Sequence, residues 1–126
     1  MGVLIDGFSL ISTKGGLGNK PQETLQVAVI RSSDGGATWS GPTIVATQQV
    51  GSVSIAGQPV RSSDELPAFA VGPEGNLYAV WQDARFSDHQ RDGIAFSTSR
   101  DGGRSWSAPR QINRAKRTQA FTASVD

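Results

Sequence analysis

The side chains best suited to chemistry crowd into one stretch of ten residues, 83–92, which holds three carboxylates, two arginines and the only histidine of the chain. Loops between scaffold strands are where binding groups accumulate. An arginine with a carboxylate partner can orient a hydroxyl or carboxylate of a ligand. The competing interpretation is a solvated loop whose charges pair with one another and contribute little. We take this stretch as the candidate site, with Asp83 and Arg85 as binding groups.

Neither a metal site nor a cofactor site is expected. His89 is a single potential ligand, and a metal centre needs further ligands at suitable spacing. The chain has no cysteine, which removes thiolate metal sites and disulfides. The glycine-rich run 14–20 ends in Lys20, but neither the Ser or Thr nor the helix of a phosphate-binding loop follows it.

One nine-residue motif occurs twice, at 32–40 and again 67 positions further on, at 99–107. Both copies fit Ser-x-Asp-x-Gly-x-(Ser/Thr)-Trp, and both are followed by a small residue and a proline. Two matches in so short a chain indicate repeated structure. The residues that define the motif are Ser32, Asp34, Gly36, Thr38 and Trp39, then Ser99, Asp101, Gly103, Ser105 and Trp106.

Each copy is typical of a hairpin turn held by its own side chains. Asp-Gly-Gly supplies positions of positive φ at low steric cost, and the carboxylate can accept backbone N–H groups inside the turn. The hydroxyls add local hydrogen bonds, and the Trp covers the turn with apolar area. A calcium site is disfavoured, because one carboxylate per turn leaves too few ligands. We therefore predict a structural role for Asp34 and Asp101.

Runs rich in β-forming residues flank both turns. The second copy belongs to four predicted strands, at 66–71, 77–81, 93–98 and 110–112. The first copy has three, at 3–11, 24–31 and 43–46. Residues 120–125 look like the first strand of a further unit. Tyr78 and Trp81 fall on opposite faces of one strand, where we expect both to pack between sheets.

These strands predict an all-β fold, a partial β-propeller of about two four-stranded antiparallel blades with the motif at their hairpins. The expected parts are an incomplete blade at 1–47, a connecting loop at 48–65, a complete blade at 66–112, and a linker with the first strand of a further blade at 113–126. A closed propeller needs roughly four to eight blades. Because unpaired edges recruit other strands, we expect either a fragment or head-to-tail assembly, in which three copies would close six blades.

Residues 24–126 resemble the Asp-box, or bacterial neuraminidase repeat, propellers, a group that includes the sialidases. The segment 66–111, in which 75–85 leads into 94–99, is similar to the first catalytic-face blade of sialidase-like proteins. The resemblance implies a six-bladed parent and a glycan partner, with glycoside hydrolysis as the activity. The alternatives are a non-catalytic carbohydrate- or protein-binding module and a purely structural repeat unit. It also implies a secreted or periplasmic protein, although the first residues lack the features of a signal peptide.

The resemblance further implies an acid/base aspartate in the loop after strand 77–81, shortly past an acidic-x-Arg step that residues 83–85 match. Asp88 and Asp92 are the two alternatives for this role. A Tyr nucleophile with its Glu partner would come from blades beyond residue 126. The isolated chain is therefore not expected to be catalytic.

The sequence departs from the sialidases at their Phe-Arg-Ile-Pro motif, whose Arg binds the substrate carboxylate. The aligned tetrapeptide is 64–67, and Glu65 stands in the place of that Arg. A carboxylate there would repel an acidic sugar. Arg61 is the candidate substitute.

Net charge and hydropathy argue against two classes of partner, nucleic acids and membranes. Twelve Lys and Arg against eleven Asp and Glu leave a net charge of +1, so neither nucleic acid nor an anionic membrane is expected as a partner. No stretch approaches the length of a membrane span.

Overall fold

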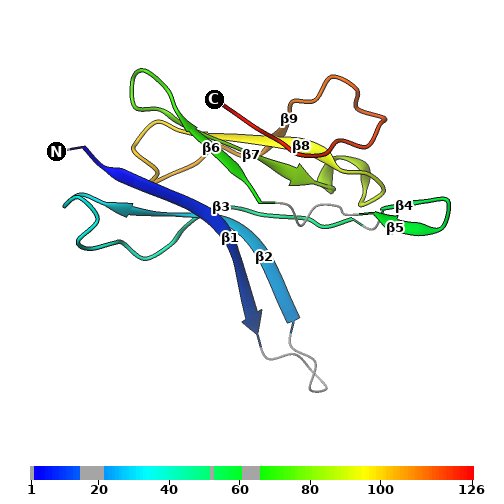
Figure 1. Ribbon diagram of the computed structural model, residues 1–126, viewed down its shortest axis with the longest axis horizontal. Coiled ribbons are helices and arrows are strands. Elements are labelled where there is room, and N and C mark those ends of the chain that lie inside the picture. The colour runs from blue at the N-terminus through cyan, green and yellow to red at the C-terminus, as the bar shows by residue number, and fades with distance from the viewer. Residues whose placement is uncertain (1, 15–21, 52, 61–65) are drawn as a thin grey trace.

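The computed structural model describes residues 2–14, 22–51, 53–60 and 66–126, and within them every sheet is antiparallel (Figure 1). The predicted all-β class is therefore confirmed. In these described segments no sheet closes on itself. No helix found in them has the length and apolar character needed to cross a membrane.

The first sheet has three strands in the order β1 (Leu4–Lys14), β2 (Gln22–Ser32) and β3 (Thr43–Thr47). The long strands β1 and β2 pair without interruption, as their content of Val, Ile, Leu and Thr favours. A register shift between Val27 and Ala28 marks a β-bulge against β3, which increases the local twist. The three strands predicted for this part of the sequence are confirmed.

The second sheet has four strands in chain order, β6 (Ala68–Val71), β7 (Leu77–Asp83), β8 (Gly93–Ser99) and β9 (Arg110–Gln111). Burial in β8 alternates strictly between buried and half-buried residues, the pattern of a strand with one face packed in a core. These are the four strands predicted within 66–112.

The segment 48–65 is not only a connecting loop, as predicted, because it contains a small hairpin of β4 (Val53–Ile55) and β5 (Gln58–Val60). The two residues between these strands, Ala56 and Gly57, both have positive φ, at 50° and 77°. That geometry matches the right-handed twist of the strands. The hairpin escaped prediction because Ala-Gly is not one of the turn dipeptides that usually mark such a loop.

The strand predicted at 120–125 is not formed. Thr122 has φ of 51°, which interrupts an extended conformation. The segment instead follows the second sheet: the N–H of Ala120 donates to the carbonyl of Asp92 (3.0 Å), and the N–H of Thr122 donates to Oε1 of Gln82 (2.9 Å). These two backbone donors are therefore satisfied without a ladder partner.

The core lies between the two sheets, one face of each contributing to it (Figure 1). Trp81 is fully buried there, as expected. Tyr78 lies on the opposite face of β7 and stacks on Phe96, with ring centroids 6.0 Å apart. The buried residues of the core are Val27, Val29 and Val45 from the first sheet and Ala79, Trp81 and Ala95 from the second.

The tightest approach between the sheets is made by Gly7 of β1 and Phe69 of β6. A Cβ built on Gly7 would lie only 2.2 Å from Cε2 of the Phe69 ring, closer than any real contact. The absence of a side chain at Gly7 therefore allows the aromatic ring to lie directly on the backbone of β1.

We predict that Gly7→Ala lowers the free energy of unfolding by about 1–3 kcal/mol, because the ring of Phe69 must move out of a packed site. Urea denaturation measures the change. Gly41→Ala is the matched control, since nothing lies within 4 Å of a Cβ at that position. The double variant Gly7→Ala/Phe69→Leu should recover part of the loss, since residues in contact are not additive; equal effects at Gly7 and Gly41 would contradict this packing.

Candidate functional site

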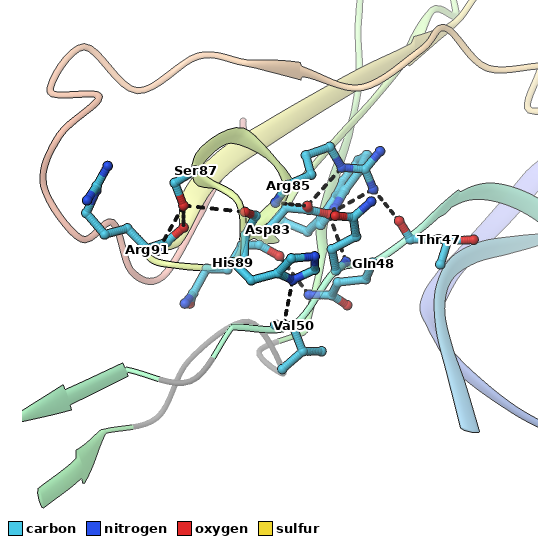
Figure 2. A network of polar contacts seen from close by, with 12 residues as sticks. Thr47, Gln48, Val50, Asp83, Arg85, Ser87, His89 and Arg91 are labelled. Carbon is cyan, nitrogen blue, oxygen red and sulfur yellow. Dashed lines mark hydrogen bonds and ion pairs between the residues drawn. The ribbon is translucent and has the colours of Figure 1, made fainter. Parts of the chain in front are cut away.

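The centre of the candidate site is the carboxylate of Asp83, the last residue of β7, which is 0% exposed. Its Oδ1 accepts hydrogen bonds from the N–H (3.0 Å) and Nε (2.8 Å) of Arg85. Its Oδ2 accepts from Nη2 of Arg85 (3.0 Å), Nε1 of Trp81 (2.8 Å) and the N–H of Gln49 (3.3 Å) (Figure 2). A buried carboxylate is tolerated when it is paired and hydrogen-bonded, and Asp83 meets both conditions.

Arg85 also connects Asp83 to the first sheet. It begins the short 3₁₀ turn η1 (Arg85–Ser87), and its Nη2 also donates to the carbonyl of Thr47 at the end of β3 (Figure 2). The structure thus brings together the two predicted binding residues as an internal ion pair. Nη1 is the guanidinium nitrogen for which the described residues show no hydrogen bond, and the Arg85 side chain is 21% exposed. That edge of the guanidinium is what remains for a ligand.

The segment that follows β3 is attached to the same loop. Nε2 of Gln48 donates to the carbonyl of Gln82 (2.8 Å), and the N–H of Ala84 donates to the carbonyl of Gln49 (2.9 Å). Gln48 and Gln49 carry no local signal of these contacts in the sequence, because their partners lie 34 and 35 positions away.

The tip of the loop consists of Asp88 and His89, both exposed and both with positive φ, at 52° and 61°. Asp and His tolerate this conformation better than most residues. The hydroxyl of Ser87 fastens the base of the tip, donating to the carbonyl of Arg91 (2.6 Å) and accepting its N–H (2.8 Å). Nδ1 of His89 lies 3.1 Å from the carbonyl of Val50. A hydrogen bond there places the proton on Nδ1 and leaves Nε2 of the neutral ring as an acceptor.

Asp92, the second alternative for the acid/base role, is in a different environment from Asp88. It is 1% exposed, and its Oδ2 accepts a hydrogen bond from Nε2 of Gln119 (2.6 Å) while its N–H donates to Oε1 of the same side chain (3.0 Å). This reciprocal contact attaches the segment after β9 to the loop. Of the two aspartates, Asp88 is the one that solvent reaches.

An open pocket of about 830 Å³ lies beside the loop tip. It is formed by the facing ends of β1 and β2 and by the segment after β3, and His89 is the member of the loop that lines it. Leu25, Val50 and Leu66 supply apolar walls, while Glu23 supplies a carboxylate. The Ser9 Oγ is buried and has no hydrogen-bond partner among the described residues. The pocket therefore combines apolar surface with the carboxylate of Glu23 and the imidazole of His89.

Two parts of the predicted site stay untested by the structure. Arg61 and Glu65 lie outside the described residues. Within the residues the structure does describe, no group of three or more His, Cys, Asp or Glu side chains is arranged to hold a metal ion.

The two repeated motifs form turns at the opposite end of the sheets from this loop, since β8 begins after the loop and ends at Ser99. In the first turn, Asp34 accepts the N–H (2.9 Å) and hydroxyl (2.6 Å) of Thr38. In the second, Asp101 accepts the N–H (2.9 Å) and hydroxyl (2.5 Å) of Ser105. The predicted hydrogen bonds within the turns are thus present.

The hydrogen bonds of the turns favour ionised carboxylates. The hydroxyl of Thr38, with its N–H and the hydroxyl of Ser32, lowers the pKa of Asp34 to about 2, against an ordinary value of 3.8. The corresponding donors, first the Ser105 hydroxyl, lower the pKa of Asp101 even further. Both carboxylates therefore stabilise the folded chain only while they carry charge.

The two tryptophans of the motifs differ in their surroundings. Nε1 of Trp39 donates to the carbonyl of Gly36 (3.1 Å), so this ring closes over its own turn. Trp106 instead packs edge-on against Phe69, with centroids 6.3 Å apart. The second motif thus joins the core, whereas the first remains on the surface.

No family model matches the chain, and the searches of curated proteins and of solved structures returned no significant match.

We predict that Asp83→Asn lowers the free energy of unfolding by about 3 kcal/mol. This is the lower end of the range for breaking a buried ion pair, because Arg85 reaches solvent. Asp88→Asn is the matched control at an exposed position of the same loop, where a change within about 0.5 kcal/mol is expected. Urea denaturation of both variants measures the difference, and equal stabilities would contradict the role assigned to Asp83.

We predict that acid weakens the fold through the two motif aspartates. Their pKa values are lower in the folded chain than the 3.8 of the unfolded chain, so their stabilisation is complete above that value. It is lost as the pH falls through about 2 for Asp34, and at still lower pH for Asp101.

The test is the melting temperature of the wild type, Asp34→Asn and Asp101→Asn as a function of pH. Each variant should melt below the wild type at neutral pH, and the gap should close as the pH falls below 3.8. A gap that is the same at every pH would show that the charge of these carboxylates is irrelevant to stability.

Proposed function

We propose that this chain forms about two blades of an Asp-box propeller of the sialidase-like class, and that the end of the sheets carrying the β7–β8 loop binds carbohydrate. Support for the propeller comes from the two antiparallel sheets packed face to face, with Asp-Gly-Gly turns at the same end of both. The repeat and its resemblance to the Asp-box proteins point the same way.

The observation that carries the binding proposal is the pocket beside His89. Sugars present both apolar C–H faces and hydroxyl groups, and binding pockets commonly combine apolar walls with a few placed polar groups. Here Leu25 and Leu66 would meet the apolar face of a sugar ring. The Glu23 carboxylate and Nε2 of His89 are the groups available for its hydroxyls.

The rigidity of the site supports the same proposal. The Asp83–Arg85 pair fixes the base of the loop to both sheets. The exposed residues at the tip are therefore held without a ligand, so that little ordering cost remains for binding.

Glycoside hydrolysis is the second candidate function. If the complete propeller is an enzyme, we assign the acid/base role to Asp88, because an acid/base group must reach the glycosidic oxygen. The buried Asp92 would instead position the segment after β9, since Gln119 contacts both its carboxylate and its N–H.

We predict that the chain binds neutral oligosaccharides at least as tightly as acidic ones, because the carboxylate of Glu23 lines the pocket. Titration of the ¹⁵N-labelled chain with lactose and with sialyllactose should shift the amides of Leu25, Val50 and His89. The amides of the two Asp-Gly-Gly turns should not move. Absence of shifts with either sugar at millimolar concentration would overturn the binding proposal.

Glu23→Gln should raise the affinity for sialyllactose relative to lactose, since it removes the negative charge from the pocket. Glu74→Gln is the matched control, in the turn between β6 and β7 at the other end of the sheet. Equal effects of the two substitutions would show that the pocket does not hold the sugar.

A further inference from the structure

Each sheet uses one face for the core and presents the other face outward. Neighbours across the strands share a face, so the strand registers define both outer surfaces. The first outer face consists of Leu4, Asp6, Phe8, Ala28, Ile30 and Ile44. The second outer face consists of Tyr78, Val80, Gln82, Ile94, Phe96, Thr98 and Arg110. Of these, Val80 and Gln82 are already buried within the chain.

We propose that the first outer face of one copy of this chain packs on the second outer face of another copy, head to tail. The interface would repeat the packing already present between the two sheets of a single chain. This inference does not depend on carbohydrate binding, since both outer faces are distinct from the pocket-lining residues.

The internal repeat fixes which residues correspond. Ser32 and Ser99 are the first residues of the two motifs, and they pair across the strands with Leu4 and Leu77 respectively. Strand β1 is therefore the counterpart of β7, and β2 is the counterpart of β8. By this correspondence, the first outer face is equivalent to the core face of the second sheet.

Exposure shows what the outer faces lack. Leu77 is 5% exposed in the core, whereas its counterpart Leu4 is 45% exposed. Trp81 is fully buried, whereas its counterpart Phe8 is only half-buried. The first outer face therefore has apolar residues like those of the core face of the second sheet, but no sheet of the described residues covers them.

The second outer face shows the converse relation. It is equivalent to the core face of the first sheet, where Val27 and Val29 are fully buried. Their counterparts Ile94 and Phe96 are half-buried. Each outer face is thus equivalent to one side of an interface that the chain already makes, and a second copy supplies the other side.

The segment at 120–125 adds a further link. Ala120-Phe121 repeats the Ala68-Phe69 with which β6 begins, and Phe121 is 46% exposed. The segment lies along the second outer face through the Thr122 contact with Gln82. It is therefore placed to lie beside β1 of the incoming copy, as β6 lies beside β7.

Charge is complementary as well. Asp6 lies between Leu4 and Phe8 on the first outer face, and Arg110 lies over the ring of Phe96 on the second, 5.0 Å from its centroid. Asp6 and Arg110 carry charges of opposite sign. Their approach in the assembly would leave neither one unpaired.

The test is the solution mass of the full chain by light scattering over a range of concentrations. The wild type should be larger than a monomer, and a trimer would correspond to six blades. Leu4→Asp should block the first outer face and Phe96→Asp the second, so each variant alone should be monomeric. An equimolar mixture should form a dimer, because each variant retains the face that the other has lost.

Ile55→Asp is the matched control, at a residue 64% exposed in the β4–β5 hairpin, and it should keep the wild-type mass. Arg110→Asp, at an exposed position, replaces Phe96→Asp if that variant does not fold. The proposal is overturned if the wild type is monomeric at every concentration, as it would be if another part of a longer chain covers these faces. It is also overturned if the mixture of Leu4→Asp and Arg110→Asp stays monomeric.

Discussion

The carboxylate of Asp83 loses all contact with water when the two sheets pack, and donors from both sides of the interface must replace that water. Trp81 and Arg85 provide them from the second sheet and its loop, and the N–H of Gln49 provides one from the segment after the first sheet. Arg85 in turn donates to Thr47. The start of the loop is therefore held against the end of β3 and the segment that follows it by one ion pair.

The opposite end of the interface is fixed by different means. There the Nε of Arg31, at the end of β2, donates to the carbonyl of Gly102 in the second Asp-Gly-Gly turn (2.6 Å). A Cβ at Gly103 would lie 3.2 Å from Leu77 and 3.6 Å from Val29, so the turn fits closely against both sheets. Hydrogen bonds within the second turn fix its shape. Its backbone can therefore contact the first sheet through the carbonyl of Gly102.

Local features of the fold could be predicted from the sequence, because alternation of β-forming residues and the Asp-Gly-Gly turns act over a few positions. The strands around both motifs were located in this way. The Ala56-Gly57 hairpin was missed because its turn has no strong signal, and the tail at 120–125 was misassigned because its hydrogen bonds go to Asp92 and Gln82 rather than to a strand. In the site, the Asp83–Arg85 proximity followed from sequence spacing. The contribution of Gln49 could not be foreseen, because it depends on how distant segments pack.

Whether the loop could act in hydrolysis depends on which of its carboxylates are free of structural hydrogen bonds. A glycosidase with two carboxylic residues needs both within reach of the bond that breaks. In the loop, Asp83 is committed to Arg85 and Trp81, and Asp92 to Gln119, so their oxygens serve the fold. Asp88 is the loop carboxylate that remains in contact with solvent. Burial thus commits two of the three acids of the loop to the fold, and for the proposed function this favours recognition over catalysis.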